Sequence, residues 1–202
     1  MPLAGAPLEP LEYFFMPRDI AIYLYHKWTN ISILLCYYSS MNIARFEKVS
    51  KEQFEKDVKD LLNMSSFDYD AIIIPRRATE GSAGYDFVCP FDLVIKPGEM
   101  IKVPTGIRCF IENNYVLQIY PRSSIGIKYQ VCLANTVGII DSDYYYAKNE
   151  GHIITALVNR GNKDFEIKKG DRIVQGIFVE YHTADEETVT AKRVGGFGSS
   201  NK

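Results

Sequence analysis

Two aspartates beside an aromatic residue are the strongest candidates for chemistry in this sequence. Asp141 and Asp143 follow an apolar run, and Tyr144 comes directly after them. Side chains two residues apart on an extended segment point the same way, so we expect the two carboxylates to share one face. A carboxylate held there could deprotonate a water molecule as a general base. Taken alone, however, two aspartates near a turn are most often solvated turn residues.

A second polar segment could bind phosphate. Arg122, Ser123 and Ser124 follow another apolar run and offer a guanidinium group, two hydroxyls and adjacent backbone N–H groups. These donors suit a chain of phosphate oxygens. Taken alone, the segment is more typical of a polar turn whose arginine makes a surface ion pair.

Several familiar catalytic motifs are absent from the sequence. It contains no GxxxxGK(S/T) phosphate loop, no GxGxxG fingerprint, no GxSxG elbow and no HExxH helix. The three histidines are scattered at positions 26, 152 and 182, which argues against a histidine-ligated metal site or a zinc deaminase. The common nucleotide-binding folds are therefore disfavoured.

The composition indicates about one globular domain with appendages. The 202 residues are 47% hydrophobic, and 23 Lys and Arg against 25 Asp and Glu give a net charge of -2. This balance excludes a disordered chain and disfavours a nucleic-acid-binding protein, so we expect a small-molecule partner. The four cysteines form no CxxC pair and fit a reducing, cytoplasmic location. Residues 20–38 fall well short of the ~18 consecutive apolar residues of a membrane span, so we expect no membrane partner.

The elements that must position these side chains are mostly short strands. Runs of β-branched and aromatic residues alternate with turn sequences and predict strands at 72–74, 93–95, 107–111, 115–120, 153–158, 165–167 and 173–181. We expect 107–111 and 115–120 to form a hairpin, and a type II turn at 96–99. No helix-length pattern appears after residue 65, so the sequence predicts an all-β sandwich or barrel of the jelly-roll type.

One short amphipathic helix is expected before the strands. Ser50 and Gln53 form a capping box at its start, and its apolar positions are Phe54, Val58, Leu61 and Leu62. The predicted organisation is an N-terminal extension at 1–40, a helical segment at 41–66, a β-barrel at 67–182 and a flexible, Gly-rich C-terminal arm at 183–202. The role of residues 1–40 is open, and one hypothesis is that Met41 is the natural start.

Five polar and glycine-rich segments, taken together in their order, are far more specific than any one of them. They lie at 83–86, 121–124, 135–144, 170–175 and 193–200, and they resemble the five signature motifs of the homotrimeric dUTPase family. The resemblance covers about residues 70–200. It implies a distorted jelly-roll barrel that hydrolyses dUTP to dUMP and pyrophosphate with Mg²⁺, in a homotrimer whose sites are shared between subunits. Such an enzyme supplies dUMP for thymidylate synthesis and limits uracil in DNA.

The resemblance also implies roles for particular residues. Asp141 would activate the water that attacks the α-phosphate, and Asp86 would hold Mg²⁺ through water. The base and sugar would be bound by Asn135, Gly138, Ile140, Tyr144, Ile154 and Phe197, with Tyr144 under the deoxyribose and Phe197 on the uracil. The phosphates would be bound by Arg122, Ser123, Ser124, Gln175, Arg193, Gly198 and Ser199.

The sequence departs from the family pattern at three places. Residues 145–150 lengthen the hairpin expected after Tyr144, Ser124 replaces a common glycine, and Arg193 stands one residue closer to the following glycines than usual, so Lys192 is an alternative phosphate contact. Two other functions stay open. A dCTP deaminase of the same fold, alone or bifunctional, would need a glutamate after the third motif, where this chain has Ile139, Ile140 and Asp141. A nucleotide-responsive regulatory trimer is the second alternative.

Overall fold

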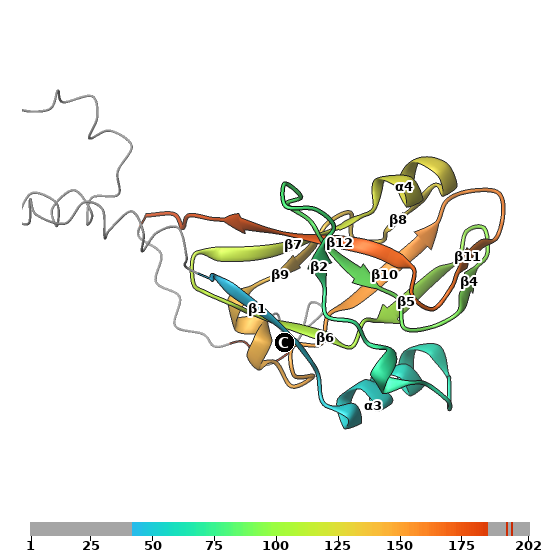
Figure 1. Cartoon of the computed structure of the whole chain (residues 1–202), viewed down its shortest axis with the longest axis horizontal. Helices are drawn as coiled ribbons and strands as arrows, with labels where there is room; N and C mark the ends of the chain where they lie inside the picture. The colour runs from blue at the N-terminus through green and yellow to red at the C-terminus, as the bar shows by residue number, and fades with distance from the viewer. Residues whose placement is uncertain (1–41, 186–192, 194, 196–202) are drawn as a thin grey trace, which may run out of the picture. The chain divides into compact units, whose positions relative to one another are not determined.

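The computed structural model describes residues 42–185, 193 and 195 of the chain (Figure 1). Short antiparallel strands dominate this part of the chain and form a distorted barrel of the jelly-roll type, so the all-β prediction is confirmed. The strands are β1 (Ala44–Lys48), β2 (Arg76–Arg77), β3 (Tyr85–Val88), β4 (Leu93–Ile95), β5 (Met100–Pro104), β6 (Ile107–Ile111), β7 (Tyr115–Pro121), β8 (Val131–Leu133), β9 (Gly138–Ile140), β10 (Ile154–Asn159), β11 (Phe165–Ile167) and β12 (Arg172–Glu180). The helical segments are α3 (Lys51–Leu62), α4 (Ser123–Tyr129) and the 3₁₀ helices η2 (Tyr69–Ala71) and η3 (Ser142–Tyr146).

Some expectations concern residues that the structure does not describe. The predictions for residues 1–40 and for most of the C-terminal arm lie outside the described residues. Within the described part, no helix has the length and apolar character that crossing a membrane requires. The domain boundaries at residues 41, 67 and 183 stay predictions.

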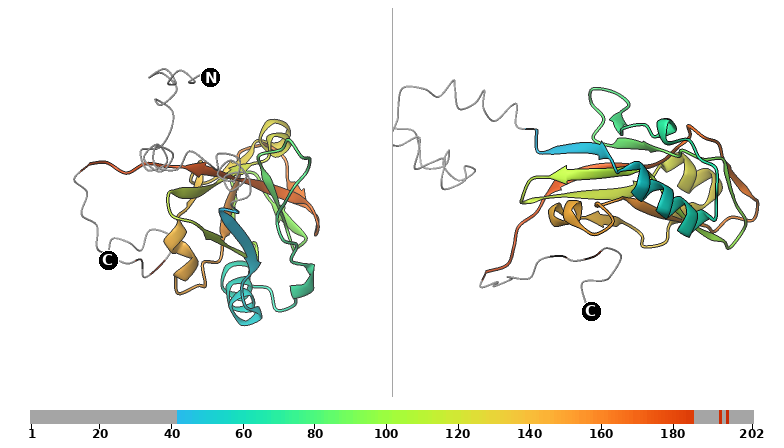
Figure 2. Two further views of the ribbon diagram at one scale, coloured as in Figure 1. Left: turned by 60° about the vertical axis from the view of Figure 1, so that its left-hand side comes forward. Right: turned by 90° about the horizontal axis from the view of Figure 1, so that it is seen from below.

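Four antiparallel sheets make up the barrel. The largest has the strand order β2-β3-β12-β7-β9, a second has the order β5-β10-β8, and the pairs β1-β6 and β4-β11 complete the structure. Figure 2 shows these strands from two further directions. The interior is filled by side chains with no exposed surface, among them Phe87, Leu117, Leu157 and Ile173. Burying apolar side chains of this size stabilises a fold by about 1.5–3 kcal/mol each.

Helix α3 begins where the Ser50–Gln53 pair predicts it, although the Gln53 side chain does not accept from the Ser50 N–H as a full capping box requires. The Ser50 hydroxyl oxygen accepts a hydrogen bond from the Gln53 N–H at 3.1 Å. The helix ends at Asn63, which adopts a left-handed conformation (φ 51°) as such end positions favour. Phe54 and Val58 are fully buried, and the helix packs against β5, at the lower edge of the barrel in Figure 1.

The turn predicted at 96–99 is confirmed. Gly98 has φ +78°, and the Glu99 N–H donates to the Lys96 carbonyl at 2.9 Å. A type II turn requires a positive φ at this position, which glycine adopts without strain.

Two predictions about strands are wrong. Residues 72–74 form no strand: Ile72 is buried beneath Gly106, but the segment has no partner strand and follows η2 instead. The segments 107–111 and 115–120 are strands joined by a turn at Asn114, yet they do not pair with each other. β6 pairs with β1, and β7 pairs with β12 and β9.

Two short helical segments were also missed. Helix α4 begins at Ser123, although no helix was expected after residue 65. The segment after Asp141 is the 3₁₀ helix η3 followed by a turn, where an extended segment and a hairpin were expected. Both are too short to produce a periodic apolar pattern.

Candidate active site

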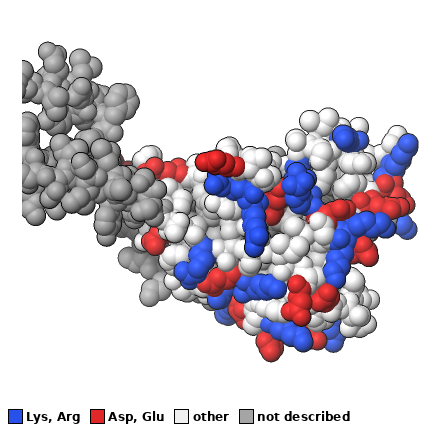
Figure 3. Space-filling model, in the orientation of Figure 1, with Lys and Arg blue, Asp and Glu red and all other residues white. Residues whose placement is uncertain are grey.

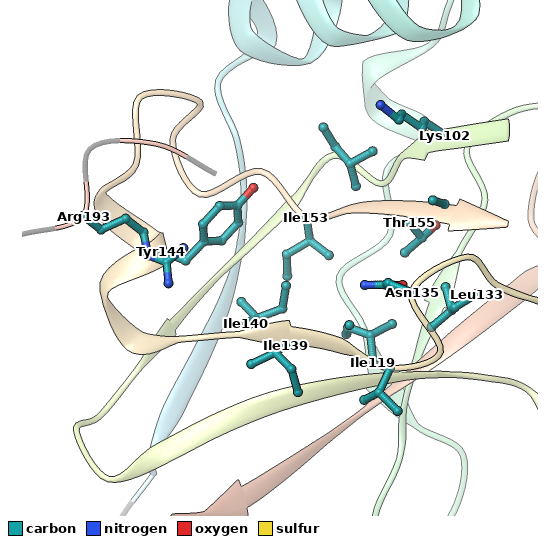
Figure 4. A pocket seen from close by; sticks show the side chains of 14 residues that line it. Lys102, Ile119, Leu133, Asn135, Ile139, Ile140, Tyr144, Ile153, Thr155 and Arg193 are labelled. Atoms are coloured by element: carbon teal, nitrogen blue, oxygen red, sulfur yellow. The ribbon is translucent and has the colours of Figure 1, made fainter. Parts of the chain in front are cut away.

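A cavity of about 340 Å³ opens between strands β9 and β10 (Figure 4). We call it the β9 pocket. Its walls are mostly apolar, with a few polar groups, as is typical of small-molecule sites. It is lined by Lys102, Ile119, Leu133, Asn135, Val137, Gly138, Ile139, Ile140, Tyr144, Ile153, Ile154, Thr155, Ala156 and Arg193.

A tight turn places the Asn135 side chain at this pocket. Thr136 adopts φ 66°, and the Val137 N–H donates to the Asn135 carbonyl at 2.7 Å. A β-branched residue rarely adopts a positive φ, and such strain gathers at functional sites. Gly138 follows, and a Cβ there would lie 3.1 Å from the Ile119 Cβ, so glycine lets β9 lie close against Ile119 of β7.

Tyr144 closes one end of the β9 pocket and is held rigidly. Only 6% of the residue is exposed, and burial raises the pKa of its hydroxyl. The hydroxyl donates to the His152 carbonyl at 2.8 Å and accepts from Asn149 Nδ2 at 2.9 Å. Both hydrogen bonds hold the hydroxyl end of the ring, and Figure 4 shows it directed toward the turn that precedes Ile153. The ring therefore forms a fixed wall.

Asp141 and Asp143 lie beside this wall and converge, although not on an extended segment. Asp141 precedes η3 and Asp143 lies within its first turn. Arg193 joins them: its Nε binds Asp143 Oδ1 at 2.7 Å, its Nη2 binds Asp141 Oδ2, and its guanidinium lies 5.8 Å from the centre of the Tyr144 ring. About half of each carboxylate side chain is exposed, so Asp141 is accessible to solvent water.

A second group of predicted site residues is connected to Asp86: Arg122 pairs with it, the two serines follow Arg122 at the start of α4, and Gln175 is its partner in the β3–β12 ladder. We call Asp86, Arg122, Ser123, Ser124 and Gln175 the Asp86 cluster. Asp86 is largely buried, and its two carboxylate oxygens bind Arg122 Nε at 3.0 Å and Arg172 Nη1 at 3.0 Å. The side-chain amide oxygen of Gln175 lies close against Gly84, where a Cβ would meet it at 2.6 Å.

The Asp86 cluster and the β9 pocket face different sides of the large sheet. Directly opposed residues of an antiparallel ladder place their side chains on the same face. Gln175 is opposed to Asp86 on β3 and to Tyr120 on β7. The next pair, Gly176 and Ile119, faces the other side, and Ile119 lines the pocket. One chain therefore presents the two groups separately.

The structure brings together most of the predicted residues that it describes. The β9 pocket collects Asn135, Gly138, Ile140, Tyr144, Ile154 and Arg193, and Asp141 lies beside it. Phe197, Gly198 and Ser199 lie outside the described residues, as does Lys192. Sequence reasoning missed the wall residues Lys102, Ile119, Leu133, Ile153, Thr155 and Ala156, because they come from strands whose pairing brings them here.

No metal-binding cage is present among the described residues. They contain no group of three or more His, Cys, Asp or Glu side chains placed to hold a metal ion. Asp86 supplies a single carboxylate, which suits a Mg²⁺ ion carried mainly by a ligand's own phosphate oxygens and waters. On the face shown in Figure 3, acidic and basic side chains are interspersed.

Comparison with known proteins identifies the family. A sequence model of the dUTPase family matches residues 70–201. The chain is 42% identical over 132 residues to the deoxyuridine 5′-triphosphate nucleotidohydrolase of Lactococcus lactis. The aligned region covers 64% of this chain and 88% of that relative. The chain belongs to the dUTPase family. The resemblance expected from the five motifs is thereby confirmed.

Solved structures agree with this assignment. A dUTPase from Streptococcus mutans is 30% identical and superimposes with a TM-score of 0.56, covering 69% of this chain and 98% of that one. A variant of the dUTPase from phage phi11 of S. aureus, which coordinates a structural Mg(II) ion, has a TM-score of 0.55 at 18% identity. The match covers 74% of this chain and 98% of that one. At that identity the second likeness concerns the fold alone.

Proposed function

We propose that the β9 pocket binds the uracil and deoxyribose of dUTP, that the Asp86 cluster binds its triphosphate, and that Asp141 activates the attacking water. As a member of the dUTPase family, the chain is a dUTP diphosphatase that hydrolyses dUTP to dUMP. The observation that carries the site assignment is the position of Asp141, an accessible carboxylate next to a rigid aromatic wall at the edge of the β9 pocket.

Base recognition would use the backbone of the pocket edges. Among the described strands, β9 pairs with β7 alone, so its other edge leaves backbone N–H and C=O groups facing the pocket. Ile154 begins β10 opposite Pro104 and lines the same pocket. Backbone donors and acceptors at fixed spacing can match the edge of uracil as a pairing base would. The amino group of cytosine would present the wrong partner.

Sugar recognition would depend on Tyr144. Its ring is held at the hydroxyl end by hydrogen bonds, and little of it is exposed. A deoxyribose packed on this ring leaves no room for a 2′-hydroxyl. The pocket would therefore reject UTP by shape.

The chemical step would be in-line attack by water at the α-phosphorus. Asp141 accepts a proton from the water, the new P–O bond forms, and the bond to the bridging oxygen breaks to release diphosphate. Arg122 and the serine hydroxyls would bind the phosphate oxygens, with Gln175 beside them. Mg²⁺ held by the triphosphate, with Asp86 reached through water, would neutralise charge on the phosphates. Arg193 would leave its pair with the two aspartates to reach the γ-phosphate.

A complete site would require more than one chain. The β9 pocket and the Asp86 cluster face different sides of the large sheet, so one chain does not bring them together. A homotrimer, as the family resemblance implies, would supply the two groups from different subunits.

Product analysis tests the function directly. We expect the purified full chain with Mg²⁺ to release dUMP and diphosphate from dUTP, with little turnover of dCTP, dTTP or UTP. Conversion of dCTP to a uracil nucleotide would instead identify a deaminase, and inactivity toward all four nucleotides would favour a regulatory trimer.

Mixed oligomers test the shared site. We expect Asp141→Asn and Arg122→Ala each to lose activity alone, and the mixture, refolded together, to regain part of it, because some sites then combine an intact pocket with an intact cluster. A mixture that forms mixed trimers, as native mass spectrometry can verify, yet stays inactive would contradict a site shared between subunits.

A further inference from the structure

The segment that precedes the family match contacts the turn that supports Tyr144 of the β9 pocket. Strand β1 and helix α3 lie before residue 70, where the match begins. Nevertheless, side chains of α3 and its cap bind the turn that joins η3 to β10. Two contacts make this connection, one through His152 and one through Glu150.

The first contact is a buried hydrogen bond between Asp57 on α3 and His152. His152 has no exposed surface, and its Nδ1 lies 2.6 Å from Asp57 Oδ2. Its Nε2 accepts a hydrogen bond from the Gly106 N–H at 2.8 Å, so the ring proton is on Nδ1 and donates to Asp57. Both ring nitrogens are engaged, which fixes the ring orientation.

Asp57 is ionised at neutral pH, which strengthens its hydrogen bond to His152. Burial raises its pKa, but hydrogen bonds from His152 and Gln53 outweigh burial, and the net effect lowers the pKa. Asp57 is therefore a charged acceptor at neutral pH. A charged acceptor makes a stronger hydrogen bond than a neutral one.

The second contact joins Ser50, the cap of α3, to Glu150. The Glu150 carboxylate accepts from the Ser50 N–H at 2.8 Å and from the Ser50 hydroxyl at 2.6 Å. Glu150 (φ 57°) and Gly151 (φ +70°) both adopt left-handed conformations, so the turn is sharp. Glu150 is the last residue of the segment 145–150 that departs from the family pattern.

His152 in turn holds the aromatic wall of the pocket. The Tyr144 hydroxyl donates to the His152 carbonyl at 2.8 Å, and the Asn149 side chain binds the same two oxygens at 2.9 and 3.3 Å. His152 therefore connects α3 to Tyr144, because its ring binds Asp57 and its backbone carbonyl binds the tyrosine hydroxyl. Movement of His152 would move the point to which the tyrosine is anchored.

We propose that Asp57 and Ser50 are positioning residues that fix Tyr144 through the 150–152 turn and thereby set the discrimination of dUTP from UTP. This inference rests on the proposed role of Tyr144 against the deoxyribose. Excluding a hydroxyl by shape demands a wall that does not shift, because a small displacement makes room for one oxygen atom. Loosening the turn should therefore affect selectivity more than turnover of dUTP.

Steady-state kinetics on the full chain tests the proposal. In Asp57→Ala, we expect the ratio of kcat/KM for dUTP to that for UTP to fall about tenfold. Asp57→Asn keeps an oxygen acceptor for His152 and should restore most of the ratio. Ser50→Ala, which loses one of the two hydrogen bonds to Glu150 and the side-chain cap of α3, should lower the ratio by about two- to threefold.

Two controls separate positioning from general stability. Asp60→Ala removes an exposed acid from the same helix and should leave the ratio unchanged. Val58→Ala weakens the packing of α3 without touching a polar contact, and it should lower the unfolding temperature but not the ratio. An equal loss of selectivity in Val58→Ala, or an unchanged ratio in folded Asp57→Ala and Ser50→Ala, would overturn the proposal. If Asp57→Ala does not fold, Ser50→Ala decides.

Hydrogen exchange provides a readout independent of activity. We expect backbone protection across residues 142–153 to fall in Asp57→Ala and Ser50→Ala, and to persist in Asp60→Ala. An unmodified chain that fails to hydrolyse dUTP would contradict the proposed function. Unchanged exchange in the two α3 variants would contradict the positioning role, whatever the activity.

Discussion

The β9 pocket and the Asp86 cluster differ in how their side chains are held. The pocket's key aromatic residue, Tyr144, is buried, and its hydroxyl donates to the carbonyl of the fully buried His152. The Asp86 cluster is held by two ion pairs whose arginine side chains, Arg122 and Arg172, are 29% and 48% exposed. Partly exposed ion pairs contribute little to stability and can rearrange around a ligand.

This difference matches the tasks proposed for the two regions. Selecting a base and a sugar depends on shape, which rigid buried contacts preserve. Binding a triphosphate depends on charge, which a guanidinium supplies without a closed pocket. Substitutions in the pocket should therefore change selectivity and stability, whereas substitutions in the cluster should change affinity.

The largest expected effect is on catalysis at the edge of the pocket. Asp141→Asn should lower kcat by about a thousandfold or more while KM changes little, because the amide cannot accept the proton from water. Asp143→Asn, next to it and bound to the same arginine, is the matched control and should retain most activity. Single-turnover kinetics measure both, and near-normal hydrolysis by Asp141→Asn would remove it as the base.

The second largest effect is on stability and selectivity, through the 150–152 turn that anchors Tyr144. Gly151 has φ +70°, and a Cβ there would lie 2.8 Å from the Tyr144 carbonyl oxygen. Gly151→Ala should therefore destabilise the fold by about 2 kcal/mol or more and lower selectivity against UTP. Gly170→Ala, also at positive φ but with nothing within 4 Å, isolates the cost of the backbone conformation. Chemical denaturation measures both, and equal losses would mean that the close approach to Tyr144 is unimportant.

Substitutions in the Asp86 cluster should mainly change the affinity for dUTP. Arg122→Lys keeps the charge but loses the planar fork, so KM for dUTP should rise about tenfold with a smaller change in kcat. Arg172→Lys changes the other partner of Asp86 and should alter KM less. Equal effects of the two substitutions would indicate that Arg122 acts by holding Asp86 rather than by binding phosphate.

The smallest effect is on the stability of the fold at acid pH, through Glu47, which binds Tyr145 of η3. Hydrogen bonds from Tyr145, Arg45 and Arg108, the first being the largest, lower the pKa of Glu47 from 4.5 to about 2 against the effect of burial. A lowered folded-state pKa stabilises the fold above the unfolded value, and this stabilisation is lost as pH falls toward the folded value. Glu47→Gln should therefore lose less stability than the unmodified chain between pH 4.5 and 2. Thermal unfolding across this range measures the difference, and parallel curves would contradict it.

Local sequence signals determined much of this protein. The Ser50–Gln53 pair fixed the start of α3, because Ser50 satisfies a free N–H of the first turn. The positive φ required at Gly98 fixed a turn, and β-branched and aromatic runs located six of the twelve described strands. The five motifs indicated the family and nearly all of the described residues proposed for the site, because each motif is a short, contiguous segment.

Tertiary structure alone decided which segments meet. The pairing of β6 with β1 rather than β7 depends on a ladder between residues 59 to 67 positions apart, which no local pattern encodes. The same holds for the pocket wall at Thr155 and for the hydrogen bond from His152 to Asp57. A scattered histidine gave no signal in the sequence, because its role depends on the burial and the partners that folding supplies.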